Sequence, residues 1–171
     1  MSGYLPEGDK NTTSASVLSL PASEVSVDEK AALLYTREEE KLARDVYNSL
    51  FVTWNNNLFQ NIAGSEQKHM DEIALMLTRY NLSDPAQAPG IFTEVKLQDL
   101  HDRLVAQGKL TIGDALKVRG AIEEIDILDL QTHLAQTDNA DIQLVYKNLM
   151  SGSYKHLRSF TSTLTSKTGE T

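Results

Sequence analysis

The chain has 171 residues, no cysteine and a formal net charge of −8. Its acidic balance argues against a surface for nucleic acid or anionic membrane, because either would need a basic patch. The lack of cysteine excludes disulfides, thiolate catalysis, iron–sulfur clusters and cysteine-based zinc sites, so a metal would have to be held by Glu, Asp and His.

The N-terminal part of the chain predicts a leader followed by two helices. Residues 1–25 are rich in Ser, Thr, Pro and Gly without periodicity, which is typical of a flexible leader. Ser26 with Glu29 three residues later is a capping-box pattern and predicts a long helix that ends near residue 54. A second helix is expected over about residues 58–80, and a short polar turn would make the two an antiparallel hairpin.

The rest of the chain predicts a long connection and a second helix pair. Residues 81–110 contain Pro and Gly breaks around one short helix, and a connection of this length permits a crossover. Further helices are expected over about residues 111–136 and 138–166, before the chain frays over residues 167–171. The expected fold is therefore all-α: one domain over residues 26–166, forming an antiparallel four-helix bundle with one long crossover connection that contains a short extra helix.

The second helix carries an unusual apolar stripe. Phe59, Ile62, Ile73 and Leu77 follow helical spacing, and Glu66 and His69 interrupt them on the same face. An ionised carboxylate on a core-facing stripe is costly unless it is paired or binds a cation. We therefore interpret Glu66 and His69 as metal ligands; the alternative is a salt-bridged surface pair.

Each of the other long helices offers a candidate ligand near its middle. The full candidate set is Glu40, Glu66, His69, Glu123, Asp126 and His156. Glu40 competes with Glu38 and Glu39, since a run of glutamates is usually a solvated face. Glu123 and Asp126 compete with Glu124 and Asp129 on the same acidic helix, where the alternative is ordinary surface charge. A lone histidine such as His156 is often a hydrogen-bonded core residue.

Three further residues are expected to support the ligands. Tyr47 and Tyr146 are interpreted as packing residues whose hydroxyls bond site carboxylates, and Arg44 as a partner of nearby acids. His101 and His133 are expected on the surface. An oxygen-rich set with a few imidazoles suits iron or manganese better than a closed structural zinc site.

The sequence resembles the ferritin-like superfamily, in particular rubrerythrin-like proteins. The resemblance rests on Glu40-x-x-Ala-Arg-x-x-Tyr47, Glu66-x-x-His69, Glu123-x-x-Asp126 and His156. It is similar, more closely still, to the uncharacterised ferritin-like DUF2202 family over about residues 28–160. The rubrerythrin resemblance implies a centre of two irons that reduces peroxide. Manganese and zinc stay open as alternative metals.

Two departures from the rubrerythrin pattern matter for function. Ser153 stands where the fourth helix would carry a bridging carboxylate, so the ion nearest His156 is expected to bind more weakly. The cysteine-rich domain that feeds electrons to such sites is missing, so an enzyme would need an external electron donor. The two hypotheses are a di-metal oxidoreductase acting on peroxide or dioxygen, and a non-catalytic bundle with a degraded or single-metal site.

Expectations about partners and compartment follow from what the sequence lacks. No apolar run approaches the roughly 20 residues of a membrane helix, so we expect a soluble protein that is cytoplasmic or exported after removal of a signal. We expect metal ions as partners, and we do not expect the protein to bind nucleic acid. A homodimer is among the assemblies that one chain leaves open.

Overall fold

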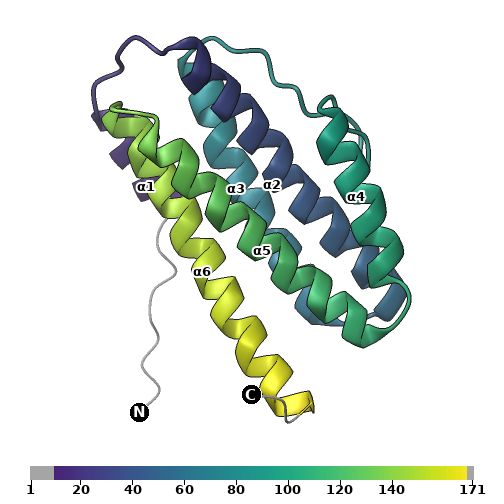
Figure 1. Ribbon diagram of the computed structural model, residues 1–171. Helices are drawn as coiled ribbons and strands as arrows, with labels where there is room; N and C mark the ends of the chain where they lie inside the picture. Colours follow the sequence, from purple (N-terminus) through teal and green to yellow (C-terminus); the bar gives the residue numbers. More distant parts are fainter. Residues whose placement is uncertain (1–9, 169–171) are drawn as a thin grey trace, which may run out of the picture.

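The computed structural model describes residues 10–168, and this part of the chain is helical with no strand, which confirms the predicted all-α class. The helices are α1 (Lys10–Ser19), α2 (Val27–Trp54), α3 (Asn57–Arg79), α4 (Val95–Gly108), α5 (Ile112–Ala135) and α6 (Ala140–Thr168). The long helices α2, α3, α5 and α6 lie side by side, with α4 against the outer side of α2 and α5 (Figure 1).

Local sequence signals set the ends of the long helices. Ser26 and Glu29 form the reciprocal capping box at the start of α2, and the Thr111 hydroxyl accepts from the Asp114 amide at the start of α5. Asn55 ends α2 with a left-handed φ of 48°, a conformation that Asn tolerates better than most residues. The hairpin of α2 and α3 therefore follows from residues close to each turn.

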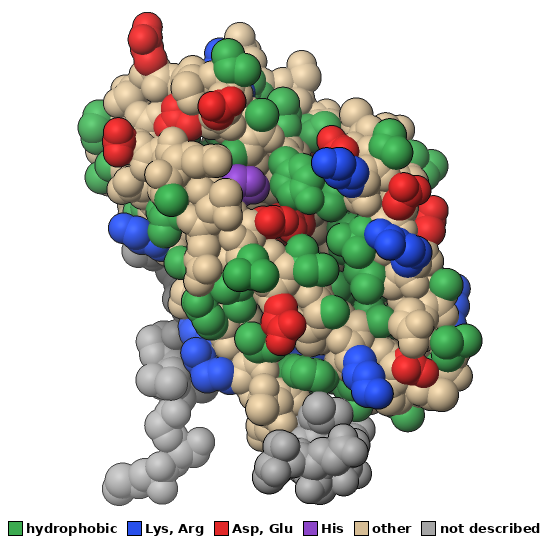
Figure 2. Space-filling model, viewed as in Figure 1, with side chains coloured by type: hydrophobic (Ala, Val, Ile, Leu, Met, Phe, Trp, Pro, Cys, Tyr) green, Lys and Arg blue, Asp and Glu red, His purple; other side chains and the backbone are tan. Residues whose placement is uncertain are grey.

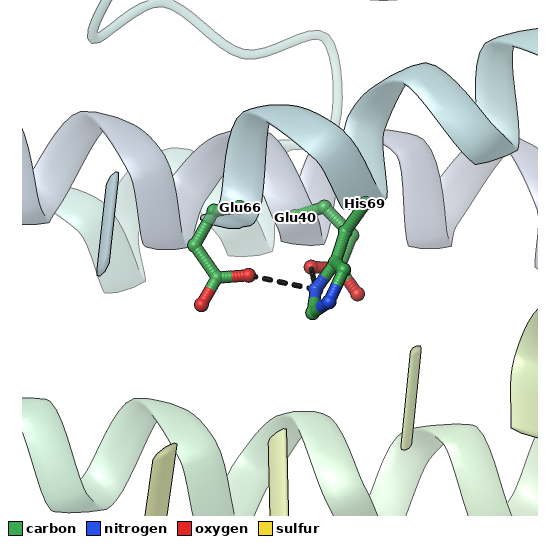
Figure 3. Close-up of side chains that lie close together, drawn as sticks. All are labelled: Glu40, Glu66 and His69. Atoms are coloured by element: carbon green, nitrogen blue, oxygen red, sulfur yellow. Dashed lines mark hydrogen bonds and ion pairs between the residues drawn. The ribbon is translucent and has the colours of Figure 1, made fainter. Parts of the chain in front are cut away.

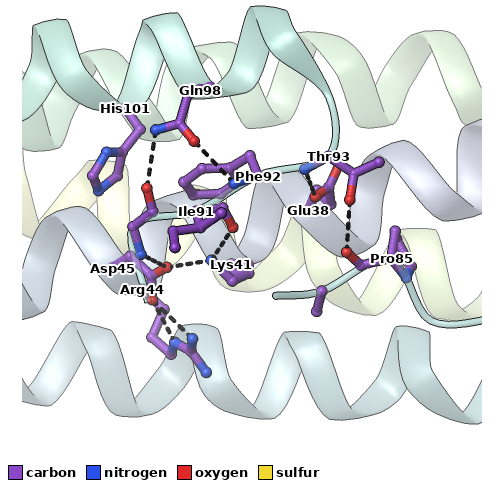
Figure 4. Close-up of polar contacts among 12 residues, drawn as sticks. Glu38, Lys41, Arg44, Asp45, Pro85, Ile91, Phe92, Thr93, Gln98 and His101 are labelled. Atoms are coloured by element: carbon purple, nitrogen blue, oxygen red, sulfur yellow. Dashed lines mark hydrogen bonds and ion pairs between the residues drawn. The ribbon is translucent and has the colours of Figure 1, made fainter. Parts of the chain in front are cut away.

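The connection after α3 crosses the molecule and contains α4. As a result α5 runs in the same direction as α3 (Figure 1). Two acidic side chains of α2 hold this connection. Glu38 accepts hydrogen bonds from the amides of Thr93 and Glu94 at 2.6 and 2.9 Å, and Asp45 accepts one from the Gly90 amide at 2.9 Å. Figure 4 shows these contacts along one side of α2.

Part of the segment assigned to the N-terminal leader forms α1. Val17 is 1% exposed in a core cluster, and the Arg79 guanidinium donates to the carbonyls of Val17 and Leu20. The remainder of the predicted leader at residues 1–9, and residues 169–171 of the predicted frayed end, lie outside the described residues.

The core is divided into two apolar clusters. The first contains Val46, Phe59 and Ile122, and the second contains Leu33 and Ile142 with their neighbours. On every long helix, polar residues separate the stretch in one cluster from the stretch in the other. We call these residues the polar band: Glu40, Glu66, His69, Glu123, Asp126, Ser153 and His156.

The charged side chains on the surface are mixed in sign. Acidic and basic side chains are interspersed on the side drawn in Figure 2. Within residues 10–168, every helix is too short or too polar to cross a membrane.

The buried pair of Lys41 and Asp45 provides a test of the packing around α2. Lys41 Nζ lies 2.7 Å from Asp45 Oδ2, donates to the Ile91 carbonyl and lies 4.0 Å from the centre of the Phe92 ring. Burial opposes ionisation of Asp45, but the bonds from Lys41, Gly90 and Arg44 outweigh it and lower the pKa of this carboxyl.

We predict that Asp45→Asn lowers the free energy of unfolding by about 3 kcal/mol at pH 7, because it leaves the Lys41 ammonium buried without its counter-ion. Since the folded pKa lies below the unfolded value, this contribution is present above the unfolded pKa and is lost as the pH falls through the folded pKa. Denaturant titrations at pH 7 and pH 3 should show the deficit shrinking at low pH. Asp99→Asn, which changes an exposed acid on α4, should show no deficit at either pH; an equal Asp45→Asn deficit at both would contradict the assignment.

Candidate metal centre

The polar band brings six predicted ligand residues to one level of the bundle. Glu40 comes from α2, Glu66 and His69 from α3, Glu123 and Asp126 from α5, and His156 from α6. All six have low exposure, and the histidine side chains, at 10% and 14%, are the most accessible. The helical spacing that buries the flanking apolar residues also turns these side chains inward.

The first group of candidate ligands contains Glu40, Glu66 and His69. His69 Nδ1 lies 2.9 Å from Glu66 Oε2 and 3.1 Å from Glu40 Oε2. Figure 3 shows both carboxylates directed at this one nitrogen. An Nδ1 atom carries at most one proton, so it cannot donate a full hydrogen bond to both carboxylates.

The second group contains Glu66, Glu123 and His156. His156 Nδ1 lies 3.1 Å from Glu66 Oε1 and 3.3 Å from Glu123 Oε1. The two groups therefore share Glu66, which directs one oxygen to each histidine. The two imidazole rings lie nearly parallel with their centres 6.0 Å apart.

The donor atoms of both groups fit the spacing of a metal coordination sphere. Within each group they all lie within 4.8 Å of one another. With metal–ligand bonds of about 2.1 Å, neighbouring ligands on one ion lie about 3.0 Å apart, which matches the contacts to Nδ1. Two further buried oxygens, Glu40 Oε1 and Asp126 Oδ1, accept no hydrogen bond from a donor group among the described residues.

Among the four carboxyl groups of the band, Glu66 is the one whose ionised form is favoured. Burial opposes its ionisation, but the imidazoles of His69 and His156 outweigh burial and hold the pKa of Glu66 well below its usual range. Burial would lower the pKa of both histidines, yet their carboxylate neighbours raise the pKa of His69 well above normal and that of His156 to about 9. The neighbouring carboxylates therefore favour the protonated form of both imidazoles.

The other carboxyls of the band are crowded. Burial, reinforced by the charge of Asp126, raises the pKa of Glu40 well above its usual range. Burial and the charge of Glu66 raise the pKa of Glu123 to about 7, and burial raises the pKa of Asp126 to about 6. Metal ligation requires deprotonated groups, so ions binding here would displace protons.

Ser153 and Asp126 form a pair across α5 and α6. The buried Ser153 hydroxyl donates to Asp126 Oδ2, and the other side of the Asp126 carboxyl adjoins Glu40. Asp126 belongs to neither group of ligands that converge on a histidine. It nevertheless places a carboxyl group from α5 next to Ser153, the α6 position at which a carboxylate ligand was expected.

The three predicted supporting residues have different surroundings. Tyr47 donates to Glu123 Oε1 at 2.7 Å, as a supporting residue would. Arg44 pairs with a neighbouring acid outside the band, Asp45, and also bonds Gln67. Tyr146 packs in the second core cluster, away from the ligand groups, and its ring contacts His133.

Sequence reasoning misses or misplaces four residues, of which two are buried beside the band and two are histidines of α4 and α5. Glu39 is 5% exposed although it sits in a run of glutamates, and Arg119 is 1% exposed and donates to the His156 carbonyl. His133 lies between the rings of Tyr35 and Tyr146, and His101 packs on Phe92, so neither is a plain surface residue. Helix periodicity gave no signal for these contacts, because each depends on a partner distant in the chain.

Gly152 makes room for one of the imidazoles. A Cβ atom at this position would lie 2.5 Å from His69 Nε2 and 2.8 Å from Cε1, closer than packed atoms approach. Glycine on α6 thus lets the His69 ring from α3 pass close to the helix backbone. The spacing of the two helices at the band depends on this small residue.

Comparisons with known proteins agree with this architecture. A family model described as "Uncharacterized protein domain (DUF2202)" matches residues 29–171. An uncharacterized protein of Methanocaldococcus jannaschii, MJ0754, is 47% identical over 146 residues, which is 84% of this chain and 79% of the relative. The crystal structure of hypothetical protein MJ0754 from Methanococcus jannaschii aligns with a TM-score of 0.84 at 46% identity, covering 86% of this chain and 85% of that one.

We predict that Gly152→Ala displaces the His69 ring and costs about 1–3 kcal/mol of stability through overpacking. The NMR signals of the His69 imidazole should shift in this variant. Gly108→Ala is the matched control, because a Cβ there would meet Leu50 at 2.6 Å, far from the band. It should destabilise the protein while leaving the His69 signals unchanged; equal effects of both variants on His69 would refute the role given to Gly152.

Proposed function

The chain belongs to the DUF2202 family, and we propose that it is a ferritin-like four-helix bundle that binds two divalent ions, iron or manganese, in the polar band. Glu40, Glu66 and His69 would hold one ion, and Glu66, Glu123 and His156 the other, with Asp126 beside them. Ferritin-like di-metal proteins use this kind of ligand set on four helices.

The observation that carries the proposal is the position of Glu66 between the two histidines. Its two oxygens lie 2.9 and 3.1 Å from different Nδ1 atoms. A carboxylate so placed could bridge two ions, one beside each histidine. Zinc is a weaker candidate, because structural zinc sites are closed spheres of four ligands.

The residues around the band would orient the ligands and limit access of water. The Tyr47 hydroxyl fixes one oxygen of Glu123, and the two apolar clusters close the band on either side. The accessible edge is formed by His69 and His156, whose side chains are the most exposed of the ligand set. A small oxidant would reach the band most directly between α3 and α6.

Bound there, a pair of iron or manganese ions would supply the redox chemistry for reducing peroxide or dioxygen with electrons from an external donor. The chain's own contribution would be to hold both ions on Glu66 and to keep the surroundings dry.

One observation favours a second candidate, a non-catalytic bundle whose band is a network of ion pairs. The protonated imidazoles and the Glu66 carboxylate already compensate one another, as the raised pKa of His156 and the lowered pKa of Glu66 indicate. Such a network would hold the helices together without metal. Metal titration separates the two candidates.

We predict that Mn²⁺ or anaerobic Fe²⁺ at 100 times its dissociation constant raises the melting temperature by roughly 5–10 °C, since an ion that binds only the folded state stabilises it by mass action. Glu66→Gln should abolish the rise, because it removes the shared charge of both groups. Asp71→Asn, at an exposed position on α3, should keep it. A parent protein whose melting temperature does not respond to either ion would favour the ion-pair network.

We also predict that Asp126 acts as a metal ligand in place of the carboxylate that α6 lacks at Ser153. Asp126→Asn should lower the affinity for one of the two ions by at least about tenfold, and Ser153→Ala should weaken it less by releasing the Asp126 carboxyl from its bond. Calorimetric titration of the metal-free proteins with Mn²⁺ measures both effects. If the Asp126→Asn variant binds two ions with the parental affinity, Asp126 is not a ligand of the centre.

A further inference from the structure

A buried carboxyl group beside the polar band has no role in the proposed centre. Glu39 is 5% exposed, and no donor group among the described residues bonds either of its oxygens; the polar group in contact with it is another acid, Asp129. Leaving a buried polar group unsatisfied costs free energy, so its retention at this place requires an explanation. The neighbouring polar groups are themselves acids, which supply no donor while they are ionised.

The side chain of Glu39 faces a small cavity that leads toward the band. This cavity has a volume of about 10 Å³, close to the space of a single water molecule, and lies between α2, α4 and α5. Glu39 and Asp126 are its polar lining, and its other walls are apolar. On the far side of the cavity, the Asp126 carboxyl adjoins Glu40 of the first ligand group.

Toward solvent, the next acid is Asp129. Its carboxyl is within bonding contact of Glu39, a contact that becomes a hydrogen bond only when one of the two groups carries a proton. Asp129 is partly exposed and lies one helical turn from Asp126 on α5. The acids therefore follow one another from the surface to the band: Asp129, Glu39, Asp126 and Glu40.

We propose that Glu39 and Asp129 form the route by which divalent cations enter the centre and leave it, an inference that rests on the proposed metal-binding function. A cation moving inward along this series of acids would meet the oxygen of a carboxyl group at each step, so it would not have to cross a purely apolar wall. The opposite side of the band presents imidazoles, so cations and a neutral oxidant would reach the ions from different sides.

A transit role and a ligand role make different predictions. Residues that only line the route change the rates of uptake and release by the same factor and leave the equilibrium affinity unchanged. A ligand changes the equilibrium itself. Replacing an acid of the route by its amide removes an attraction for the cation in a low-dielectric channel. We expect this to lower the rates of uptake and release by about tenfold or more.

The test is stopped-flow absorbance of Co²⁺ uptake by the metal-free full chain, with release followed by adding a chelator and stoichiometry measured by calorimetry. Glu39→Gln should slow uptake and release at least about tenfold and still bind the parental number of ions. Asp129→Asn should act in the same direction, and it carries the test if Glu39→Gln does not fold. Glu124→Gln, an equal charge change at an exposed position of α5, should keep the parental rates.

Three outcomes would overturn the proposal. Parental uptake rates in both route variants would show that cations enter elsewhere. A lower stoichiometry in Glu39→Gln would make Glu39 a ligand and not part of a route. A parent chain that binds no ion would instead refute the proposed function, and the route with it, so the two failures are distinguishable.

Discussion

Burying ionised carboxylates between apolar cores carries a large solvation penalty, and the packing of this chain is arranged around compensating it. The polar band crosses all four long helices at one level, with an apolar cluster on each side. Two imidazoles and Glu66 offset one another, while the remaining acids stay crowded and have raised pKa values. A band that is only partly neutralised by its own residues is what a cation site requires, since bound ions would supply the missing positive charge.

Residues other than the candidate ligands hold the band in register. Gly152 allows α6 to approach α3 at His69, and Tyr47 fixes Glu123 from α2. The connection after α3 and helix α4 cover the outer side of α2, so Glu38, Glu39 and Lys41 are all buried together with Glu40. Four successive residues of one helix can be buried only when the helix is covered on every side. The same coverage creates the enclosed acids that lead from Asp129 inward.

Sequence reasoning reached the helices and the main candidate ligands because their signals are local. Capping residues such as Ser26 and Thr111 mark helix ends within one turn, and the stripe through Glu66 and His69 shows which face is buried. It did not reach α1, whose docking depends on Arg79 bonding carbonyls from the first 20 residues. It also read Glu39 as part of a solvated run, since nothing near Glu39 in sequence reveals that α4 covers it. The bond from the Gly90 amide to Asp45 likewise comes from a connection 45 residues farther along the chain.

Anomalous diffraction tests most directly whether Glu66 would bridge two metal ions. Crystals of the full chain grown with Mn²⁺ or anaerobic Fe²⁺ would be measured on both sides of the metal absorption edge. The account predicts two anomalous peaks, one in bonding contact with Glu40, Glu66 and His69 and the other with Glu66, Glu123 and His156. A well-ordered crystal with no peak in the polar band, and with Glu66 bonded only to protonated imidazoles, would contradict it.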